Sequence, residues 1–380
     1  MRAFALCADI NGIHLFPQAV KGKPHSDFSK VIDAMEGAKV IYDNAEHKQN
    51  AAYFHQGFNY GDFGNMNNRI PNYREYRDQN LLSLICGSHG VINYNWRADI
   101  YPELAIGMPA LTKELTYLSE VFLSPDSKLA ISPVKELRAM SKEFSGNHYF
   151  FVCNAQMKDA EINISIPGIS KLAKKLNVIS EGRSVALNGD SFSEKFYPYE
   201  VHVYTTCADN SGLETVSSIC ARIDKANEEK RKPGNLAFEL NEGDSVAVTA
   251  SSNQIPLRRP DNALWHVVDG VNFKRTDFEL NGVWHSKPED KTPWIEIRFP
   301  EQKSIAKVIV YPYKQSLKDY SVQGFVNGNW VDLDKVTGKN DECLTHKFAP
   351  VTTDRVRLLI SAVNGKCAEV SEIEIYGPEK

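Results

Sequence analysis

The stretch Pro293-Trp-Ile-Glu-Ile-Arg-Phe299 decides the fold of the last third of this 380-residue chain. Its apolar and polar residues alternate with a period of two, which is typical of a half-buried β-strand. The same kind of short segment recurs between turn residues at 245–253, 268–270, 282–286, 305–311, 355–360 and 371–377. Strands of this kind, separated by Gly, Pro, Asn and Asp, predict an all-β sandwich. Because such folds carry ligands on their end loops, we expect this segment to bind a partner.

Length and composition indicate a globular protein with more than one domain. A chain of 380 residues, 42% hydrophobic and 24% charged, can bury a sizeable core but is too long for a single ordinary one. The net charge of -4, with both signs interspersed, excludes the basic surface of a nucleic-acid-binding protein. The sequence shows neither the apolar run of a transmembrane segment nor a signal peptide after Met1, so it carries no visible export address.

The cysteines are odd in number and scattered, without a C-x-x-C pair. They are Cys7, Cys86, Cys153, Cys207, Cys220, Cys343 and Cys367. This pattern argues against a disulfide framework and against a zinc site, and favours buried or incidental thiols. A bridge between Cys343 and Cys367 stays open if their strands are neighbours.

Residues 1–124 alternate strand-like and helix-like segments. Strands are expected at 4–7 leading into 12–16, at 51–55 and at 90–95, and helices at 26–42, 73–86 and 104–122. A β-α-β-α-β-α order implies parallel strands joined by crossover helices. Three strands alone cannot close a barrel.

The middle of the chain changes character. Short strands at 149–154, 161–166, 176–179 and 200–204 predict a small antiparallel β-domain over residues 126–206. Residues 207–235 are polar and increasingly charged before Pro233-Gly234, which predicts a helical linker. Residues 236–378 are then expected to form the C-terminal β-sandwich. The fold class is therefore multidomain, α/β followed by all-β.

Several runs in the first 205 residues resemble the C-terminal part of a modular glycoside hydrolase built on a (β/α)8 barrel. Ala8-Asp-Ile-Asn-Gly-Ile-His-Leu-Phe-Pro17 is similar to a late barrel strand, and the runs 69–77 and 81–94 resemble the penultimate helix and the final strand. Phe196-Tyr-Pro-Tyr-Glu-Val-His-Val-Tyr204 is similar to the closing strand of the β-domain that follows such barrels. The resemblance implies that residues 1–124 are a partial TIM-barrel segment with the last three strands and helices.

The last segment resembles the F5/8 type C (discoidin) family, a galactose-binding-like jelly roll. The resemblance depends on Val246–Asn253, Val268-Asp-Gly270, Trp284-His-Ser286, Pro293–Ile297 and Glu372-Ile-Glu-Ile-Tyr-Gly377. Members are often fused to glycosidases as carbohydrate-binding modules, so the implied partner is a glycan or polysaccharide. It also implies an extracellular or periplasmic location.

Hydrolysis of a glycosidic bond needs two carboxyl groups, which a barrel enzyme places at the C-terminal ends of its strands. If 51–55 is the seventh strand, its end reads His55-Gln-Gly-Phe-Asn-Tyr60 and lacks the nucleophile. Asp62 and Asp99 are the only carboxylates expected near the mouth, and a loop Asp is usually a turn residue. The catalytic residues are therefore unknown. The candidate substrate-binding residues at the strand ends are His14, His55, Gln56, Asn59, Asn95 and Trp96, and ordinary loop polarity explains any one of them equally well.

The family resemblance also implies a structural Ca2+ bound by oxygen atoms from the Asp-Gly loop and the last strand. The matching residues are Asp269 and Glu372, with Asn272 and Thr276 as additions from the same loop. Asp269-Gly270 would also make a good turn without any metal.

Sugar contacts in this family vary among members, so the candidates follow from side-chain chemistry alone. They are Arg258, Trp265, His266, Tyr313 and Asn364, with Gln254, Arg259 and Lys366 beside them. Trp284 and Trp294 lie in strand-like runs and are expected in the core.

Two functions remain open. The first is a glycoside hydrolase-like, carbohydrate-active protein, which would hydrolyse O-glycosidic bonds only if the missing barrel strands are supplied. The second is a non-enzymatic glycan-binding or adhesion protein that uses the discoidin-type module. A smaller α/β enzyme of another class is a third alternative with little support, because no phosphate loop, G-x-S-x-G or H-E-x-x-H motif occurs.

Overall fold

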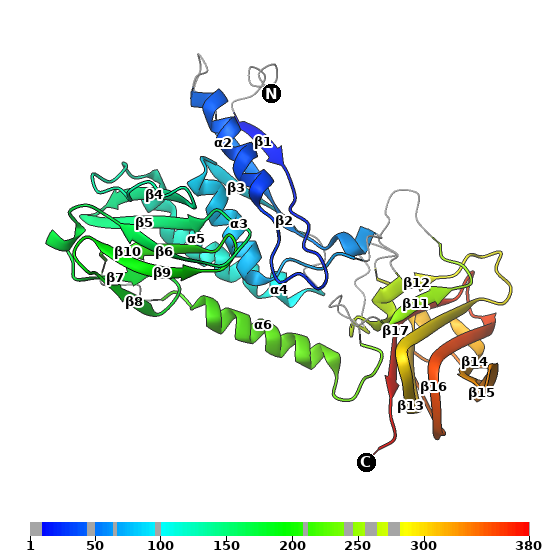
Figure 1. Cartoon of the computed structure of the whole chain (residues 1–380). Coiled ribbons are helices and arrows are strands. Elements are labelled where there is room, and N and C mark those ends of the chain that lie inside the picture. The colour runs from blue at the N-terminus through cyan, green and yellow to red at the C-terminus, as the bar shows by residue number, and fades with distance from the viewer. Residues whose placement is uncertain are drawn as a thin grey trace. The chain divides into compact units, whose positions relative to one another are not determined.

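The computed structural model describes residues 10–43, 50–63, 67–95, 100–207, 212–238, 246–254, 264–272 and 282–379. The chain forms two compact units (Figure 1). The first consists of Met1–Phe58 and Ile70–Asp224, and the second of Asn59–Arg69 and Lys225–Lys380. The predicted segments 1–124 and 126–206 thus fall almost entirely in one unit.

The first unit opens with a three-stranded parallel sheet in the order β1-β2-β3. The strands are β1 Ile10–His14, β2 Asn50–Gly57 and β3 Gly90–Asn95, and the helices are α2 Ser29–Asp43, α3 Tyr73–Ile85, α4 Pro102–Ala105 and α5 Gly107–Leu123. Both strand pairs are parallel, with Ile10 opposite Asn50 and Ala52 opposite Gly90. This confirms the predicted order of strands and crossover helices. The described residues contribute three parallel strands and do not close a barrel.

Helix α2 forms because its apolar residues recur at helical spacing and line one buried face, from Val31 to Tyr42. Helix α3 begins with a capping box, in which Asn72 accepts a hydrogen bond from the Glu75 amide and Glu75 accepts one from the Asn72 amide. Among the described helices, none is both long and apolar enough to cross a membrane.

Antiparallel strands form the rest of the first unit, as predicted. A five-stranded sheet has the order β4-β5-β10-β7-β8, and β6 pairs with β9. The bounds are β4 Leu137–Phe144, β5 Asn147–Asn154, β6 Ala160–Ser165, β7 Lys175–Val178, β8 Arg183–Ala186, β9 Ser191–Phe196 and β10 Val201–Thr205. The sequence did not predict β4, β8 and β9. Their side chains are largely polar and partly exposed, so hydrophobic alternation is weak there.

The parallel and antiparallel parts of the first unit share one hydrophobic core. Met35 of α2, Leu81 of α3 and Leu118 of α5 belong to the same buried cluster as Phe151 of β5 and Val203 of β10. Burial of each such side chain contributes about 1.5 to 3 kcal/mol, so neither part has a complete core without the other.

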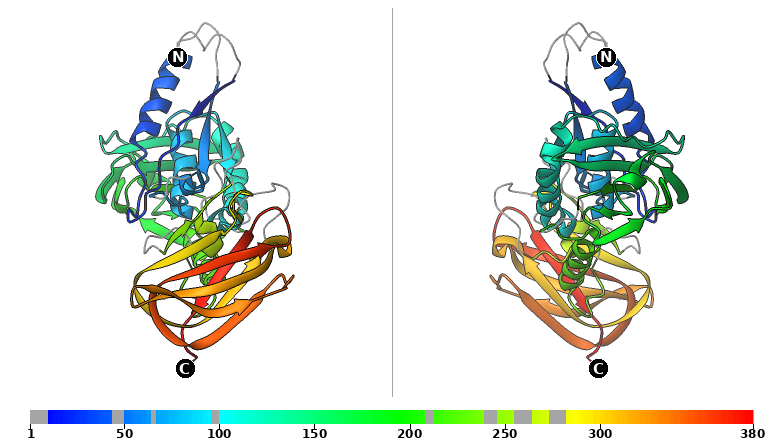
Figure 2. Two further views of the ribbon diagram at one scale, coloured as in Figure 1. Left: turned by 90° about the vertical axis from the view of Figure 1, so that its right-hand side faces the viewer. Right: turned by 90° about the vertical axis from the view of Figure 1, so that its left-hand side faces the viewer.

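Helix α6, Val216–Arg231, occupies the predicted linker, and the boundary between the two units falls within it. The sandwich that follows has the strand order β12-β17-β13-β16-β14-β15, with β11 paired to β13. Its strands are β11 Ala247–Ala250, β12 Trp284–His285, β13 Trp294–Pro312, β14 Leu317–Val326, β15 Asn329–Val336, β16 Leu344–Val363 and β17 Glu369–Tyr376. The long strands β13 and β16 lie side by side and curve through the sandwich (Figure 2).

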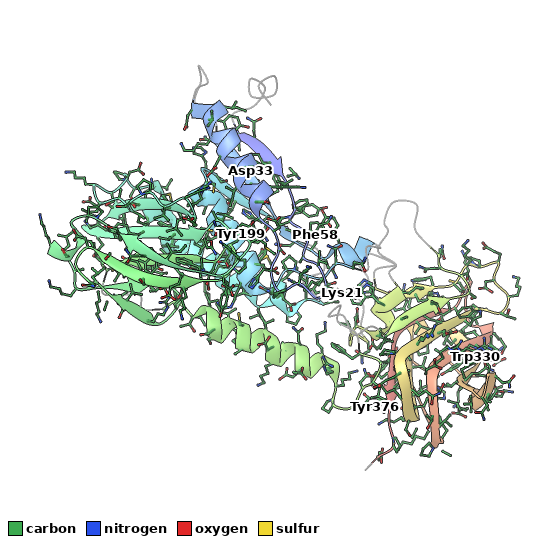
Figure 3. All side chains as sticks on the ribbon, in the orientation of Figure 1. Lys21, Asp33, Phe58, Tyr199, Trp330 and Tyr376 are labelled. Atoms are coloured by element: carbon green, nitrogen blue, oxygen red, sulfur yellow. The ribbon has the colours of Figure 1, made fainter. Side chains whose placement is uncertain are left out.

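The sandwich core consists of the inward side chains of these strands, among them Ile295, Ile297 and Trp284. The prediction that Trp284 is a core residue is confirmed. The same prediction for Trp294 is wrong: it is only half-buried, because it lies one residue before buried Ile295 and strand side chains alternate between faces. Figure 3 shows the side chains of both units, with Trp330 of β15 and Tyr376 of β17 labelled.

Candidate functional site

Aromatic rings gather at the C-terminal ends of the parallel strands in the first unit. The exposed ring of His14 stacks on Phe54 with centroids 3.7 Å apart, and Phe16 contacts both Phe58 and Tyr94. Tyr94 is 47% exposed. Ligands of parallel α/β folds bind at this edge of the sheet, and ring faces suit the apolar faces of sugars. We call His14, Phe16, Phe54, Phe58 and Tyr94 the aromatic edge.

Of the aromatic edge, only His14 is predicted from the sequence. Gly12 of β1 shows why the cluster forms: a Cβ at this position would lie 2.5 Å from the Phe54 ring. Glycine therefore lets the ring lie against the strand backbone. The spacing of Ile92 and Tyr94 in β3 could have identified Tyr94 from the sequence. The two residues are two positions apart, so both side chains lie on one strand face, and both are exposed.

The other strand-end candidates have internal partners. His55 is fully buried, and its Nε2 lies 3.0 Å from Ser83 Oγ of α3. Burial lowers the pKa of His55 to about 3, so the ring is neutral at pH 7. Gln56 is also buried and donates to the Phe58 carbonyl oxygen. These contacts give both residues a packing role in this structure, and substrate binding by them stays a prediction.

Asn95 and Asn59 are held by local hydrogen bonds. Asn95 Oδ1 accepts from Tyr76 Oη at 3.1 Å, and buried Asn59 accepts from the Gly61 amide at 2.7 Å. Several predicted residues lie outside what the structure describes: Trp96, Asp99, Arg258, Arg259, Thr276, residues 4–7 and the side chain of Asp62.

A charged cavity of about 520 Å³ lies within the first unit, beside the antiparallel sheet. Phe196 and Tyr197 form part of its wall, together with Glu181, Glu200 and His202. His202 Nδ1 lies 2.5 Å from Glu181 Oε1, and its Nε2 lies 3.5 Å from Glu200 Oε2. Burial by itself lowers the pKa of His202, but the two carboxylates outweigh it and raise the pKa to about 9.

Neither of these carboxylates suits acid catalysis. Burial raises the pKa of Glu181 and of Glu200, but the interactions with His202 outweigh burial and leave both pKa values below the usual range. Cleavage of a glycosidic bond needs an acid whose pKa is raised, so that it carries a proton at neutral pH. The cluster is therefore an ion network that stabilises the sheet.

A second ion network joins helix α3 to strand β10. Arg77 donates from Nε and Nη2 to both oxygens of Glu114, at 2.8 and 2.7 Å, and from Nη1 to the Val201 carbonyl oxygen. Asp78 accepts from the Val201 amide at 3.3 Å. Burial raises the pKa of Asp78 to about 8, although Arg77 acts in the opposite direction. These contacts position the start of β10 on α3.

In the second unit, a loop end of the sandwich holds two of the sugar-binding candidates. Tyr313 is half-buried in the short helix η4, Tyr313–Gln315, and its ring lies 6.3 Å from that of His285. The next two residues, Lys314 and Gln315, have φ values of 48° and 56°. Such left-handed conformations are uncommon outside glycine and persist only where tertiary contacts hold them.

Asn364 supplies those contacts. Its Nδ2 lies within hydrogen-bond distance of the carbonyl oxygens of Gln315, Leu317 and Lys339, at 2.9, 3.2 and 3.0 Å. Its backbone amide donates to the Ser316 carbonyl oxygen at 2.7 Å. Asn364 therefore fixes the loop that presents Tyr313. We call Tyr313, Lys314 and Asn364 the loop-end surface.

The two candidates near the start of the sandwich are placed differently. Trp265 and His266 lie in the short helix η3, Leu264–Val268, and are only 2% and 1% exposed. A helical turn directs both rings into the interior, so neither presents an exposed face, and sugar binding by them stays a prediction. His266 Nδ1 instead lies 3.0 Å from Asp269 Oδ2.

Two of the candidate calcium ligands, Asp269 and Glu372, lie at the turn formed by Asp269 and Gly270. Asp269 and Glu372 are fully buried, and Glu372 Oε1 accepts from the Gly270 amide at 3.1 Å. The Asn272 carbonyl oxygen lies nearby in sequence and accepts from Ser371 Oγ. Gly270 has φ of 78°, and a Cβ there would lie 2.5 Å from a backbone carbonyl oxygen. Two buried carboxylates at a tight turn are a donor set that fits a hard cation.

The described cysteines are all free, including Cys343 and Cys367, so no bridge joins these two. Cys367 is buried beside Glu369 of β17. Burial and this carboxylate raise the pKa of the Cys367 thiol to about 11.

Comparison with known families identifies the sandwich. Residues 247–373 match the model of the F5/8 type C domain, which confirms the resemblance for this part of the chain. No curated protein sequence matches the chain.

Solved structures similar to this chain include isolated sugar-binding modules. Chitosan-binding module 2 of a chitosanase/glucanase from Paenibacillus sp. IK-5, in complex with chitotriose, is 21% identical and covers 38% of this chain and 100% of its own, with a TM-score of 0.30. A fucose-binding module from Streptococcus pneumoniae is 19% identical over 38% of this chain and 98% of its own, with a TM-score of 0.31. A Clostridium perfringens module in complex with GalNAc-β-1,3-galactose is 17% identical. The match covers 35% of this chain and 95% of the module, with a TM-score of 0.29.

Proposed function

We propose that the F5/8 type C module of this chain binds a glycan through the loop-end surface. The observation that supports this proposal is the conformation of the loop. Two successive non-glycine residues with positive φ follow Tyr313, and Asn364 holds them in place. Backbone conformations of this kind cost about 1 to 3 kcal/mol each, and they concentrate at binding sites. The tyrosine ring offers a stacking face, while Lys314 and Asn364 are polar groups suited to sugar hydroxyls. The matched family and the sugar-binding modules of similar fold agree with this choice of ligand.

The test is titration of the full chain with chitooligosaccharides and with galactose-, fucose- and N-acetylhexosamine-containing glycans. Tyr313→Ala should weaken binding at least tenfold, or about 1.4 kcal/mol, because the stacking face is removed. Tyr197→Ala is the matched control, since Tyr197 is 52% exposed but belongs to the first unit. Absence of binding to every glycan, or equal losses in both variants, would contradict the proposal.

The same proposal includes a structural Ca2+ held by Asp269 and Glu372, with Asn272 and Thr276 as further ligands. The convergence of two buried carboxylates on Gly270 supports it. Calcium at 100 times its Kd should stabilise the second unit by about 2.7 kcal/mol. Thermal unfolding followed by tryptophan fluorescence should show this gain in the native chain and not in Asp269→Asn. A gain that persists in this variant would assign the ion to another site.

A second candidate function assigns the first unit to a glycoside hydrolase-like barrel. The aromatic edge favours it, because its rings lie at the carboxyl ends of parallel strands, where barrel enzymes bind substrate. Hydrolysis of aryl glycosides by the full chain, lowered in His14→Ala, would support this function. Glycan binding without any hydrolysis would favour the non-enzymatic binding protein.

A further inference from the structure

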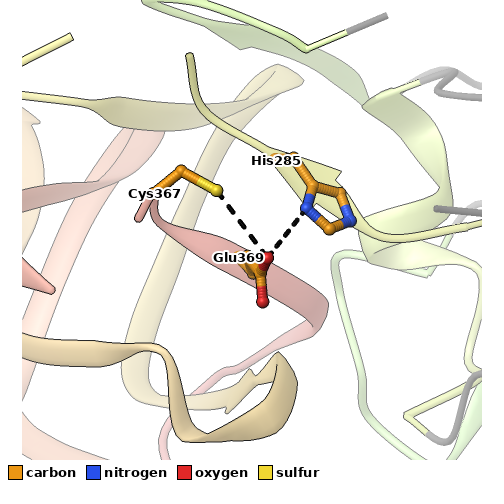
Figure 4. A group of neighbouring side chains, drawn as sticks. All are labelled: His285, Cys367 and Glu369. Atoms are coloured by element: carbon orange, nitrogen blue, oxygen red, sulfur yellow. Dashed lines mark hydrogen bonds and ion pairs between the residues drawn. The ribbon is translucent and has the colours of Figure 1, made fainter. Parts of the chain in front are cut away.

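Three side chains of different chemistry meet at the edge of the sandwich where β12 pairs with β17 (Figure 4). His285 Nδ1 lies 3.1 Å from Glu369 Oε1, and Cys367 Sγ lies 3.7 Å from the same oxygen. The three atoms all lie within 4.8 Å of one another. Nitrogen, sulfur and carboxylate oxygen are the ligands that Zn2+ takes in proteins.

We propose that His285, Cys367 and Glu369 form a binding site for a transition-metal cation of the Zn2+ class. Tetrahedral zinc holds sulfur at about 2.3 Å and nitrogen or oxygen at about 2.0 Å. That geometry separates nitrogen from oxygen by about 3.3 Å and sulfur from oxygen by about 3.5 Å. The observed separations of 3.1 and 3.7 Å each differ from these values by about 0.2 Å. The third separation, between the His285 nitrogen and Cys367 Sγ, is at most 4.8 Å, and rotation of these two side chains would have to bring it to about 3.5 Å.

The backbone that carries the three ligands is held firmly. His285 and Glu369 are opposite each other in the β12-β17 pair. The Ser286 amide donates to the Ala368 carbonyl oxygen at 2.9 Å, and the Glu369 amide donates to Ser316 Oγ at 3.0 Å. His285 and Glu369 therefore keep their separation without further ordering, which favours metal binding, while Cys367 lies in a bend just before β17.

The charges also balance. Binding displaces the thiol proton of Cys367 to solvent and moves the ring proton of His285 to Nε2. One divalent cation then faces one thiolate and one carboxylate, with no net charge in a mostly buried site. The Glu369 side chain is 23% exposed, which leaves access for the ion and room for a water molecule as the fourth ligand.

This site differs in chemistry from the proposed calcium site. Calcium prefers oxygen atoms alone, whereas sulfur and imidazole nitrogen select softer transition metals. The cysteine spacing argued against zinc because two ligands of one site usually lie close in sequence. Here the histidine and the glutamate are 84 residues apart and meet only through strand pairing.

The test is titration of the reduced full chain with Co2+, which reports thiolate ligation as a charge-transfer absorption band. The native protein should bind one Co2+ with this band and release it to Zn2+. Cys367→Ser should abolish the band and weaken binding at least tenfold. Cys343→Ser is the matched control, because it removes an exposed free cysteine of the same unit, and it should leave the band unchanged.

Two further measurements separate metal binding from a hydrogen-bonded structural triad. Glu369→Gln keeps an acceptor oxygen but loses the charge, so it should weaken Co2+ binding while changing the unfolding midpoint little. In the native protein, Zn2+ should protect Cys367 from alkylation in the peptide mass spectrum. A native chain without the band at excess Co2+, a band that persists in Cys367→Ser, or alkylation of Cys367 unaffected by Zn2+ would overturn the proposal.

Discussion

His202, one of the buried histidines of the first unit, gives a stability prediction with a definite pH signature. His202 lies between Glu181 and Glu200 and is 4% exposed. In His202→Gln both carboxylates lose the imidazolium between them, although Arg183 still contacts Glu181 at 2.8 Å and Arg74 lies 3.8 Å from Glu200. We expect this substitution to destabilise the first unit by an amount that depends strongly on pH.

The magnitude follows from the pKa of His202. The folded state raises it from 6.5 to about 9, a difference of about 2.5 pH units, and each unit corresponds to about 1.4 kcal/mol. A pKa raised on folding means that the folded state binds the proton more tightly than the unfolded chain. The resulting stabilisation of about 3 kcal/mol is fully present below pH 6.5 and is lost as pH rises through 9.

Urea unfolding at pH 6 and at pH 9.5 measures the effect, with far-UV circular dichroism as the probe. Four of the five tryptophans, from Trp265 to Trp330, belong to the second unit, so fluorescence would report the wrong part of the chain. The helical signal comes largely from the first unit, which contains α2, α3 and α5. The native protein should exceed His202→Gln by about 3 kcal/mol at pH 6 and by much less at pH 9.5.

His148→Gln is the matched control for this experiment. His148 is a half-buried histidine of the same sheet whose Nδ1 lies 2.8 Å from Ser127 Oγ, so its loss leaves the ion network in place. This variant should keep the pH dependence of the native protein. Equal losses in His202→Gln at both pH values would refute the assigned role of the two carboxylates, as would the absence of any loss at pH 6.

Three further substitutions test other parts of the structure. Arg77→Ala leaves the buried carboxylate of Glu114 without its bidentate partner and should cost the first unit about 3 to 5 kcal/mol in urea unfolding, whereas a loss below about 1 kcal/mol would contradict the pairing. Gly270→Ala should destabilise the second unit more than Gly328→Ala, measured by tryptophan fluorescence. Both glycines have positive φ, but only the first has a neighbour within reach of an added Cβ, so equal losses would argue against the close approach. Asn364→Ala removes the donors that hold the loop-end surface and should cost about 1 to 2 kcal/mol. Its glycan affinity, measured by calorimetry, should fall as well, and unchanged affinity would mean that the loop needs no such support.

Hydrophobic periodicity predicted most strands and helices of this chain because burial of one face imposes it locally. The helix from 73 to 86 and the strand from 90 to 95 agree with α3 and β3 within a residue. Periodicity did not separate the half-buried Trp294 from the buried Trp284. Both follow the same local pattern, and only the packing of the sheet decides which face is covered.

The local sequence pattern contributed far less to the prediction of the candidate sites than to the prediction of the fold. The sequence identified Tyr313 and Asn364, but their roles as a presented ring and the residue that supports it follow from hydrogen bonds between distant loops. Trp265 and His266 have side chains suited to sugar binding. They lie in a short helix that the sequence did not predict, and this helix buries them.

The sequence by itself determined the two fold types and the helical linker, since each depends on repeating local patterns that bury one face of an element. The F5/8 type C assignment came instead from motifs that resemble this family, and the family model matches residues 247–373. Tertiary structure decided which polar side chains meet. His285, Cys367 and Glu369 converge because two strands pair across a long stretch of chain, and His202 acquires its charge from carboxylates on separate segments. Electrostatics and ligand geometry act over a few ångströms in space, and neighbours at that distance are fixed only when the chain has folded.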